Sequence, residues 1–184
     1  CIELIQPTEG IFIDIGANIG LYSIIINRII NRKTISFEGS PINFSSFLNN
    51  LQINKFKEDE IIPCDIVLSD KSKVCKFGHF LKSNTGMSKI INPQTYQYND
   101  FKSFIVNTAP INSILSFLEV TTISLIKMDV EGSEYDILSN FDFEKWKPKY
   151  FQIELLFKNE FENSKRVFDL LINHNYMPFT LEDK

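Results

Sequence analysis

The chain has 184 residues, of which 43% are hydrophobic and 23% are charged. These values are typical of a soluble globular protein, and the length suits one domain with a sizeable core. The net charge of −4 excludes a global basic field that would attract nucleic acid, so we expect no nucleic-acid partner.

Cysteine and histidine are too few and too dispersed for a disulfide framework or a zinc site. Cys1, Cys64 and Cys75 form no CxxC pair, and His79 and His174 are far apart. This cysteine usage suits a reducing compartment, and we predict a cytoplasmic protein. No signal peptide is visible, and no apolar run approaches the ~20 residues of a membrane span. The start at Cys1 instead of Met indicates a fragment of a longer chain.

Short apolar runs alternate with helical patterns in the first third of the chain. In chain order they predict a strand at 11–15, a helix at 19–31, a strand at 34–38, a helix at 40–53 and a strand at 60–68. Ser40 suits the N-cap of the second helix, and Pro41 suits its first position. Pro63 is expected to bend the third strand.

The region 73–109 interrupts this order. Residues 73–80 alternate as an edge strand does, and turn residues separate the apolar pieces that follow, so we expect an inserted antiparallel or irregular segment. The remaining patterns predict a helix at 111–119, a strand at 123–132, a helix at 133–141, a strand at 149–157, a helix at 160–176 and a candidate final strand at 177–181.

The alternation of strands and helices predicts an α/β fold with a mostly parallel twisted sheet, helices on both faces and right-handed crossovers. In such sheets ligands bind beyond the carboxyl ends of the strands, where the strand order reverses. The polar positions expected at that edge are Asp14 to Gly20, Glu38 to Ser40, Ser69 and Asp70, Asp129 to Glu134, and Glu154.

The first of these positions, "DIGANIG", places Asp14 at a buried strand end and Gly16, Asn18 and Gly20 in the turn after it. The glycines permit a sharp turn and a close approach of ligand to backbone. The helix that follows offers free N–H groups to a carboxylate, and an acid suits an ammonium group. A tight turn alone would explain the glycines, but it would not explain the acid. The motif differs from the GxGxxG of dinucleotide sites.

Two further acidic positions lie in register with this turn. Glu38 closes the second strand, where doubly wound nucleotide folds place an acid that accepts bonds from ribose hydroxyls. Asp129 and Glu131 alternate on one side of a later strand or its exit, where desolvating two acids is costly without partners. For Glu134 we prefer a structural role in the first helical turn, where the helix dipole favours an acid, and Ser133 is the expected cap.

These motifs together resemble a known family. The stretches "FIDIGANIGLYSI", "SFEGSP" and "IKMDVEGSEYDIL" resemble the glycine loop, acidic strand end and DVEG block of FkbM-type S-adenosylmethionine-dependent methyltransferases. The stretches "DIVLSDKS" and "FQIEL" are similar to further family segments, and the resemblance covers residues 10–180. The chain departs from the family at Ile111 and Asn112, where a Leu-Asp pair is usual.

The resemblance implies a Rossmann-like class I methyltransferase fold in one domain over 1–184, without the usual N-terminal helix and with a candidate truncation at the C-terminus. It implies the cofactor S-adenosyl-L-methionine, and a hydroxyl acceptor on a sugar, glycan or small natural product. The implied cofactor residues are Asp14, Gly16, Ala17, Asn18 and Gly20 at the methionine part, Glu38 and Gly39 at the ribose, Ser69 and Asp70 near the adenine or ribose, and Asp129 near the methyl group.

A hydroxyl acceptor needs a base to take its proton. Glu131 is our first candidate, followed by Asp129, Glu154 and His79, although a partly exposed strand position explains His79 without any function. The three acids could also supply oxygen ligands to a metal ion, but we predict no metal site. The alternatives to a methyltransferase are a non-catalytic module that binds S-adenosylmethionine and, with less support, an NAD(P)-dependent oxidoreductase.

Overall fold

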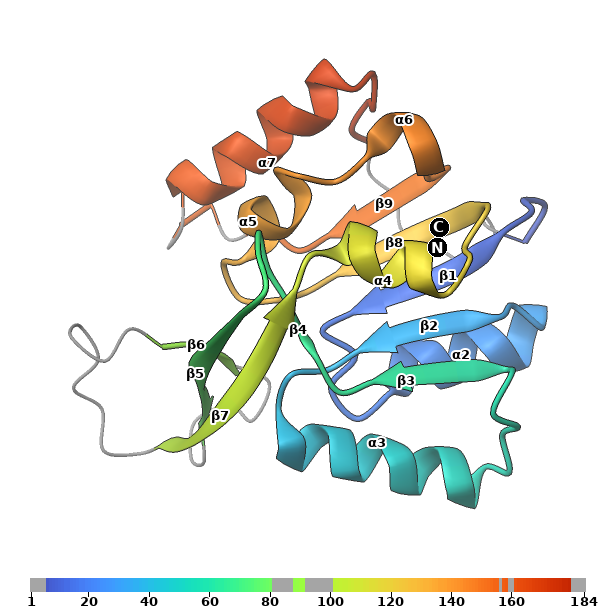
Figure 1. The fold of residues 1–184 in the computed structure, drawn as a ribbon. Coiled ribbons are helices and arrows are strands. Elements are labelled where there is room, and N and C mark those ends of the chain that lie inside the picture. Colours follow the sequence, from blue (N-terminus) through green and yellow to red (C-terminus); the bar gives the residue numbers. More distant parts are fainter. Residues whose placement is uncertain (1–5, 81–87, 92–100, 156, 159–160, 180–184) are drawn as a thin grey trace.

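The computed structural model describes residues 6–80, 88–91, 101–155, 157–158 and 161–179 (Figure 1). Its larger sheet has five parallel strands in the order β3-β2-β1-β8-β9. Their bounds are β1 (Ile11–Ile15), β2 (Thr34–Phe37), β3 (Ile61–Cys64), β8 (Ile123–Met128) and β9 (Tyr150–Ile153). The strand order reverses between β1 and β8, which is the position where such sheets bind ligands.

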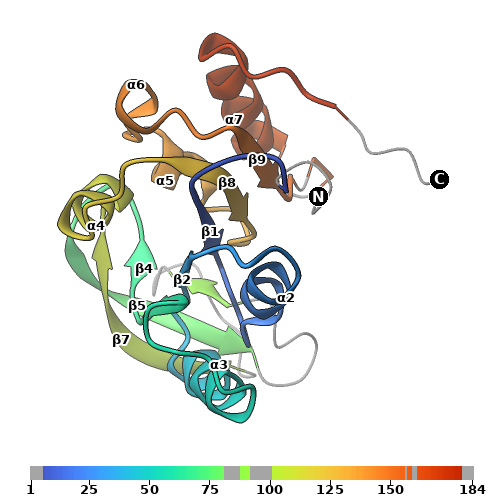
Figure 2. The ribbon, with the colours of Figure 1, turned by 90° about the vertical axis from the view of Figure 1, so that its right-hand side faces the viewer.

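The two central strands of this sheet are buried on both faces, which explains their nearly continuous apolar sequence. Helices α2 (Leu21–Ile30) and α3 (Pro41–Ile53) pack through two core clusters centred on Phe12 and Phe47. A larger cluster joins the sheet to α4 (Ile111–Phe117), α5 (Glu134–Leu138), α6 (Phe143–Trp146) and α7 (Phe161–Asn173). Figure 2 shows α2 and α4 on opposite sides of the sheet, as the sequence predicted.

The insertion forms a second, smaller sheet with the order β4-β7-β5-β6. Its strands are β4 (Val67–Leu68), β5 (Lys73–Phe80), β6 (Lys89–Ile90) and β7 (Phe101–Ala109). β5 pairs with β7 in antiparallel fashion along its whole length, from Lys73 opposite Thr108 to Phe80 opposite Phe101. The prediction of an inserted antiparallel segment is therefore confirmed, although part of the region 73–109 lies outside the described residues.

The predicted single strand at 60–68 is wrong. The chain leaves the larger sheet after Cys64 and re-enters strand structure at Val67 in the smaller sheet, so β3 and β4 belong to different sheets. Pro63 lies within β3 without breaking it, because β3 is an edge strand and, among the described residues, one row of its backbone groups has no neighbouring strand.

The other differences concern element ends. The strand predicted to reach residue 132 ends at Met128, and α6 was not predicted. Its four residues are too short for a periodic signal, and it begins with a cap in which Asp142 accepts a bond from the Lys145 N–H at 2.9 Å. Residues 177–179 form no strand, and 180–181 lie outside the described residues.

Two of the sequence predictions concern helices: the cap at Ser40 and the lack of a helix that could span a membrane. Ser40 caps α3 as predicted, since its hydroxyl accepts a bond from the Asn43 N–H at 3.4 Å, with Pro41 in the first turn. None of the helices within the described ranges combines the length and the apolarity that crossing a bilayer requires.

The burial of Phe47 on α3 leads to a prediction about the stability of the fold. Phe47 is fully buried, whereas the neighbouring Leu48 is 43% exposed on the same helix. We expect Phe47→Ala to lower the free energy of unfolding by about 3–5 kcal/mol, because it removes a buried ring and leaves a cavity. Leu48→Ala is the control and should cost less than about 1 kcal/mol. Urea titration followed by circular dichroism measures both, and equal effects would contradict the assignment of Phe47 to the core.

Candidate functional site

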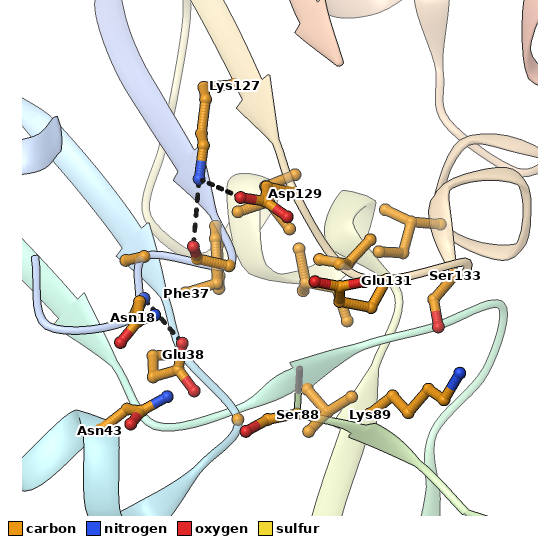
Figure 3. Close-up of a pocket in the computed structure, with 18 of the residues that line it drawn as sticks. Asn18, Phe37, Glu38, Asn43, Ser88, Lys89, Lys127, Asp129, Glu131 and Ser133 are labelled. Atoms are coloured by element: carbon orange, nitrogen blue, oxygen red, sulfur yellow. Dashed lines mark hydrogen bonds and ion pairs between the residues drawn. The ribbon is translucent and has the colours of Figure 1, made fainter. Parts of the chain in front are cut away.

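A cavity of about 540 Å³ opens at the carboxyl ends of the central strands (Figure 3). One wall comes from the turn after β1, the end of β2 and the segment after β8. The opposite wall comes from the smaller sheet, through Phe77, Ser88, Lys89 and Ile90. The insertion therefore closes a crevice that the larger sheet leaves open.

The turn after β1 brings its backbone directly against the cavity. Gly16 has a φ of +77°, and a Cβ atom there would lie 1.9 Å from the Asp129 carbonyl oxygen. Only glycine fits this position, which joins the exits of β1 and β8. Of the turn residues that we expected to bind the cofactor, Gly16, Ala17 and Asn18 line the cavity, whereas Gly20 does not. A Cβ at Gly20 would lie 2.0 Å from the Phe47 ring, so that glycine serves packing.

Asp14 is fully buried and is not among the residues that line the cavity. The Ser23 hydroxyl donates to its Oδ2 at 2.6 Å, and the Lys127 Nζ lies 3.5 Å from its Oδ1. Burial raises the pKa of Asp14, while Lys127 and Ser23 act in the opposite direction. The ammonium group beside Asp14 is therefore one of the protein's own, and the expected contact of this acid with the cofactor stays a prediction.

Lys127 is a site residue that the sequence reasoning missed. Its side chain is 8% exposed, and its Nζ lies 3.5 Å from Asp14 Oδ1 and 3.7 Å from Asp129 Oδ2. It also donates to the Gly16 carbonyl at 3.1 Å and lies 5.3 Å from the centre of the Tyr22 ring. The available signal was the alternation of Lys127, Met128 and Asp129, which places the lysine and the acid on one side of the strand.

Glu38 lies at the end of β2 and lines the cavity with Gly39, as predicted. Its Oε2 accepts a bond from the Asn18 N–H at 2.8 Å (Figure 3). Its Oε1 accepts a bond from the Ser40 N–H at 2.7 Å. Burial raises the pKa of Glu38 to about 7, although these hydrogen bonds and one with Asn43 act to lower it. The carboxyl group therefore changes its charge near neutral pH.

Asp129, Glu131 and Glu154 also line the cavity, as predicted from their positions after β8 and β9. Burial, followed by the charges of Asp129 and Glu154, raises the pKa of Glu131. The pKa of Glu154 is raised first by the charge of Asp129 and then by a hydrogen bond between the two side chains. In the described part of the chain, no group of three such side chains is arranged to hold a metal ion.

The loop that carries Glu131 has an unusual backbone. Glu131 has a φ of 52° and Gly132 has a φ of 99°, so two consecutive residues adopt left-handed conformations. Glu134 is buried and accepts bonds from the Gly132 N–H at 3.2 Å and from the Asn163 side chain at 2.8 Å. Its role is thus to tie this loop to α7, and the expected side-chain cap from Ser133 does not form.

Ser69 and Asp70 do not line the cavity, contrary to the prediction. The Ser69 hydroxyl donates to Asp70 at 3.0 Å, and Asp70 forms ion pairs with Lys71 at 3.8 Å and Lys73 at 3.9 Å. The reason is that β4 belongs to the smaller sheet and not to the larger one. As a result, the apolar residues before Ser69 line the cavity in its place: Ile66, Val67 and Leu68.

His79 is buried rather than partly exposed, and it does not line the cavity. Its Nδ1 lies 3.0 Å from the Ser40 hydroxyl and 3.1 Å from the Ser88 hydroxyl. Burial and then the charge of Lys102 lower the pKa of His79, so a neutral ring links the smaller sheet to the start of α3. Ser88 and Lys89, which do face the cavity, come from the insertion and carry no sequence signal that points to it.

Comparison with known proteins agrees with this geometry. Residues 14–178 match the family described as the Methyltransferase FkbM domain. The chain is 25% identical over 153 residues to "Methyltransferase 1" of Beauveria bassiana (strain ARSEF 2860), covering 76% of this chain and 61% of that protein. The crystal structure of Methyltransferase FkbM from Methylobacillus flagellatus KT is similar with a TM-score of 0.58 and 18% identity, over 90% of this chain and 36% of that one.

The structural similarity confirms the predicted Rossmann-like class I methyltransferase fold. The chain spans about three fifths of the length of its fungal relative. The family match begins at Asp14 in the glycine turn and extends past α7, so it includes every strand end that forms the cavity. The chain therefore belongs to the FkbM methyltransferase family.

Proposed function

We propose that this protein is an S-adenosylmethionine-dependent methyltransferase that acts on a hydroxyl group of a sugar, a glycan or a small natural product. The observation that carries this proposal is the position of Glu38. It places a buried carboxylate acceptor beside the glycine turn, in the same cavity as Asp129 and Glu131. Membership of the FkbM family supports methyl transfer as the reaction.

The residues at the cavity fit the parts of this cofactor. Glu38 offers acceptor oxygens to ribose hydroxyls, and the apolar side chains of Phe37, Ile66 and Leu68 offer a surface for the adenine. Gly20, the N-cap residue of helix α2, provides no side-chain cap, so the first N–H groups of the helix remain for a carboxylate. Asp129 offers an acceptor for an ammonium group, the role that Asp14 was expected to fill.

The reaction follows from this arrangement. S-adenosylmethionine supplies an activated methyl group on a sulfonium, so the protein's main task is alignment of the two reactants. Glu131 is the proposed base, because it lines the cavity and burial raises its pKa, which makes the carboxylate a stronger base. His79 is no longer a candidate base, since it faces Ser40 and Ser88 rather than the cavity.

We also retain the proposal of a cytoplasmic location. Cys64 and Cys75 are free thiols, which suits a reducing compartment. Burial raises the pKa of Cys64 to about 11, so this thiol stays protonated and unreactive at neutral pH.

Calorimetric titration tests the choice of cofactor. We expect S-adenosylhomocysteine, the product form of the cofactor, to bind with a 1:1 stoichiometry, and NAD to bind at least about a hundredfold more weakly, since the turn has no GxGxxG spacing. Binding of NAD without a response to S-adenosylhomocysteine would refute the proposal. Binding of S-adenosylhomocysteine without transfer to any acceptor would favour the non-catalytic module.

The charge state of Glu38 should make cofactor binding depend on pH. Ribose hydroxyls donate to the ionised carboxylate, which loses its proton with a pKa of about 7 in the ligand-free protein. The affinity for S-adenosylhomocysteine should therefore rise about tenfold from pH 6 to pH 8 and level off above that. Glu38→Gln should weaken binding and remove this slope. A slope that persists in Glu38→Gln would assign it to another group.

The same raised pKa predicts how stability depends on pH without ligand. The pKa of Glu38 is about 4.5 in the unfolded chain and about 7 in the folded protein. Stability from the protonated form is thus present below pH 4.5 and is lost as the pH rises to 7. Compared with Glu38→Gln, the wild type should lose stability across this interval, which denaturant titration at several pH values can measure.

Glu131→Gln separates binding from chemistry. The substitution keeps the shape of the side chain and removes its basicity, so affinity for S-adenosylhomocysteine should stay within about twofold while methyl transfer falls by 10²-fold or more. Screening glycans and nucleotide sugars for radiolabelled methyl incorporation identifies the acceptor for this assay. Normal turnover by Glu131→Gln would exclude Glu131 as the base.

A further inference from the structure

The Lys127 side chain sits among three oxygen atoms, one from β1, one from the turn after β1 and one from the segment after β8. Its ammonium nitrogen lies 3.5 Å from Asp14 Oδ1, 3.7 Å from Asp129 Oδ2 and 3.1 Å from the Gly16 carbonyl oxygen. Lysine is rarely buried to this extent unless it is paired. Asp14 Oδ1 in turn has no hydrogen-bond partner, so the charge of Lys127 is what compensates that buried oxygen.

Neutralisation of Asp14 does not account for the whole arrangement. A buried ion pair is often no more stabilising than a well-packed apolar pair in its place. Lys127, however, also contacts Asp129 and the Gly16 carbonyl, and all three of these residues line the cavity. Figure 3 shows the lysine reaching from its strand toward Asp129. One buried charge thus fixes two acceptor groups on the cavity wall.

These groups are complementary to a free α-amino acid. Asp129, whose side chain is 40% exposed, faces the cavity and suits an ammonium group. The ten-residue helix α2 begins without a side-chain cap, and Leu21 and Tyr22 of its first turn line the same cavity, where a carboxylate is favoured. The Lys127 Nζ lies 3.7 Å from Asp129 Oδ2 and 5.3 Å from the centre of the Tyr22 ring, so it contacts both of these cavity residues.

We propose that Lys127 is a positioning residue for the amino-acid end of the cofactor, holding Asp129 and the Gly16 carbonyl against Asp14 in the geometry that receives that group. This inference rests on the proposed function and deepens it. It also moves the recognition of the ammonium group from Asp14 to Asp129, with Asp14 as the buried countercharge of the lysine.

Two ligands separate this role from general support of the fold. S-adenosylhomocysteine carries the amino-acid group, and 5′-methylthioadenosine has the same adenine, ribose and sulfur but lacks it. In calorimetric titrations, Lys127→Met should lose at least about tenfold in affinity for S-adenosylhomocysteine, as expected for lost charge-assisted contacts. Affinity for 5′-methylthioadenosine should change by less than about twofold, a difference within about 0.4 kcal/mol.

Lys127→Met leaves Asp14 as an uncompensated buried acid, which can unfold the protein. The double variant Asp14→Asn with Lys127→Met removes both charges and should fold, as thermal unfolding followed by circular dichroism would show. It should display the same selective loss for S-adenosylhomocysteine. Lys149→Met is the matched control, because it removes the same charge from an exposed lysine that does not line this cavity. Its affinities should equal those of the wild type.

Three results would overturn the inference. Affinity for S-adenosylhomocysteine equal to that of the wild type in either variant would exclude a role at the amino-acid end. Equal losses for both ligands, or a double variant that does not fold, would assign Lys127 to the general structure. If the wild type binds neither ligand, the proposed function itself fails, and this is seen before any variant is made.

Discussion

The structure depends most on one ion pair between adjacent parallel strands. Asp14 of β1 and Lys127 of β8 are direct partners in the strand register, and both side chains are buried. A shift of the register by one residue would place an apolar residue opposite Asp14 and leave two unpaired charges in the core, at a cost of several kcal/mol. The pair therefore fixes how β1 and β8 align, and this alignment brings the Gly16 turn against Asp129.

The two sheets contribute different parts of the cavity. The larger sheet supplies the acids and the glycine turn, whose positions are set by strand ends and a short parallel register. The smaller sheet supplies the opposite wall and contacts the start of α3 through His79, whose Nδ1 lies within hydrogen-bond distance of Ser40 and Ser88. Because Ser40 also donates its N–H to Glu38, a change in the insertion can reach the proposed ribose site through two hydrogen bonds.

The features that the sequence predicted well are those with local signals. The β1 turn, the Ser40 cap and the acids after β8 follow from spacing within a few residues, and each lies where it was expected. The partner of Asp14 could not be predicted in the same way, because it depends on the register of strands 113 residues apart. Ser69 was misplaced for a similar reason, since no local pattern shows that β4 leaves the larger sheet.

The backbone at Glu131 shows how such a site keeps its shape. A left-handed conformation in a residue with a side chain costs about 1–2 kcal/mol and persists only where the surroundings enforce it. Here the enforcing group is Glu134, which accepts bonds from the Gly132 N–H and from Asn163 on α7. The loop is thus held by two residues that do not line the cavity. Glu131 lies near the like charges of Asp129 and Glu154, so its own side-chain contacts do not hold it in position. Glu134 and Asn163 instead fix the backbone that carries it.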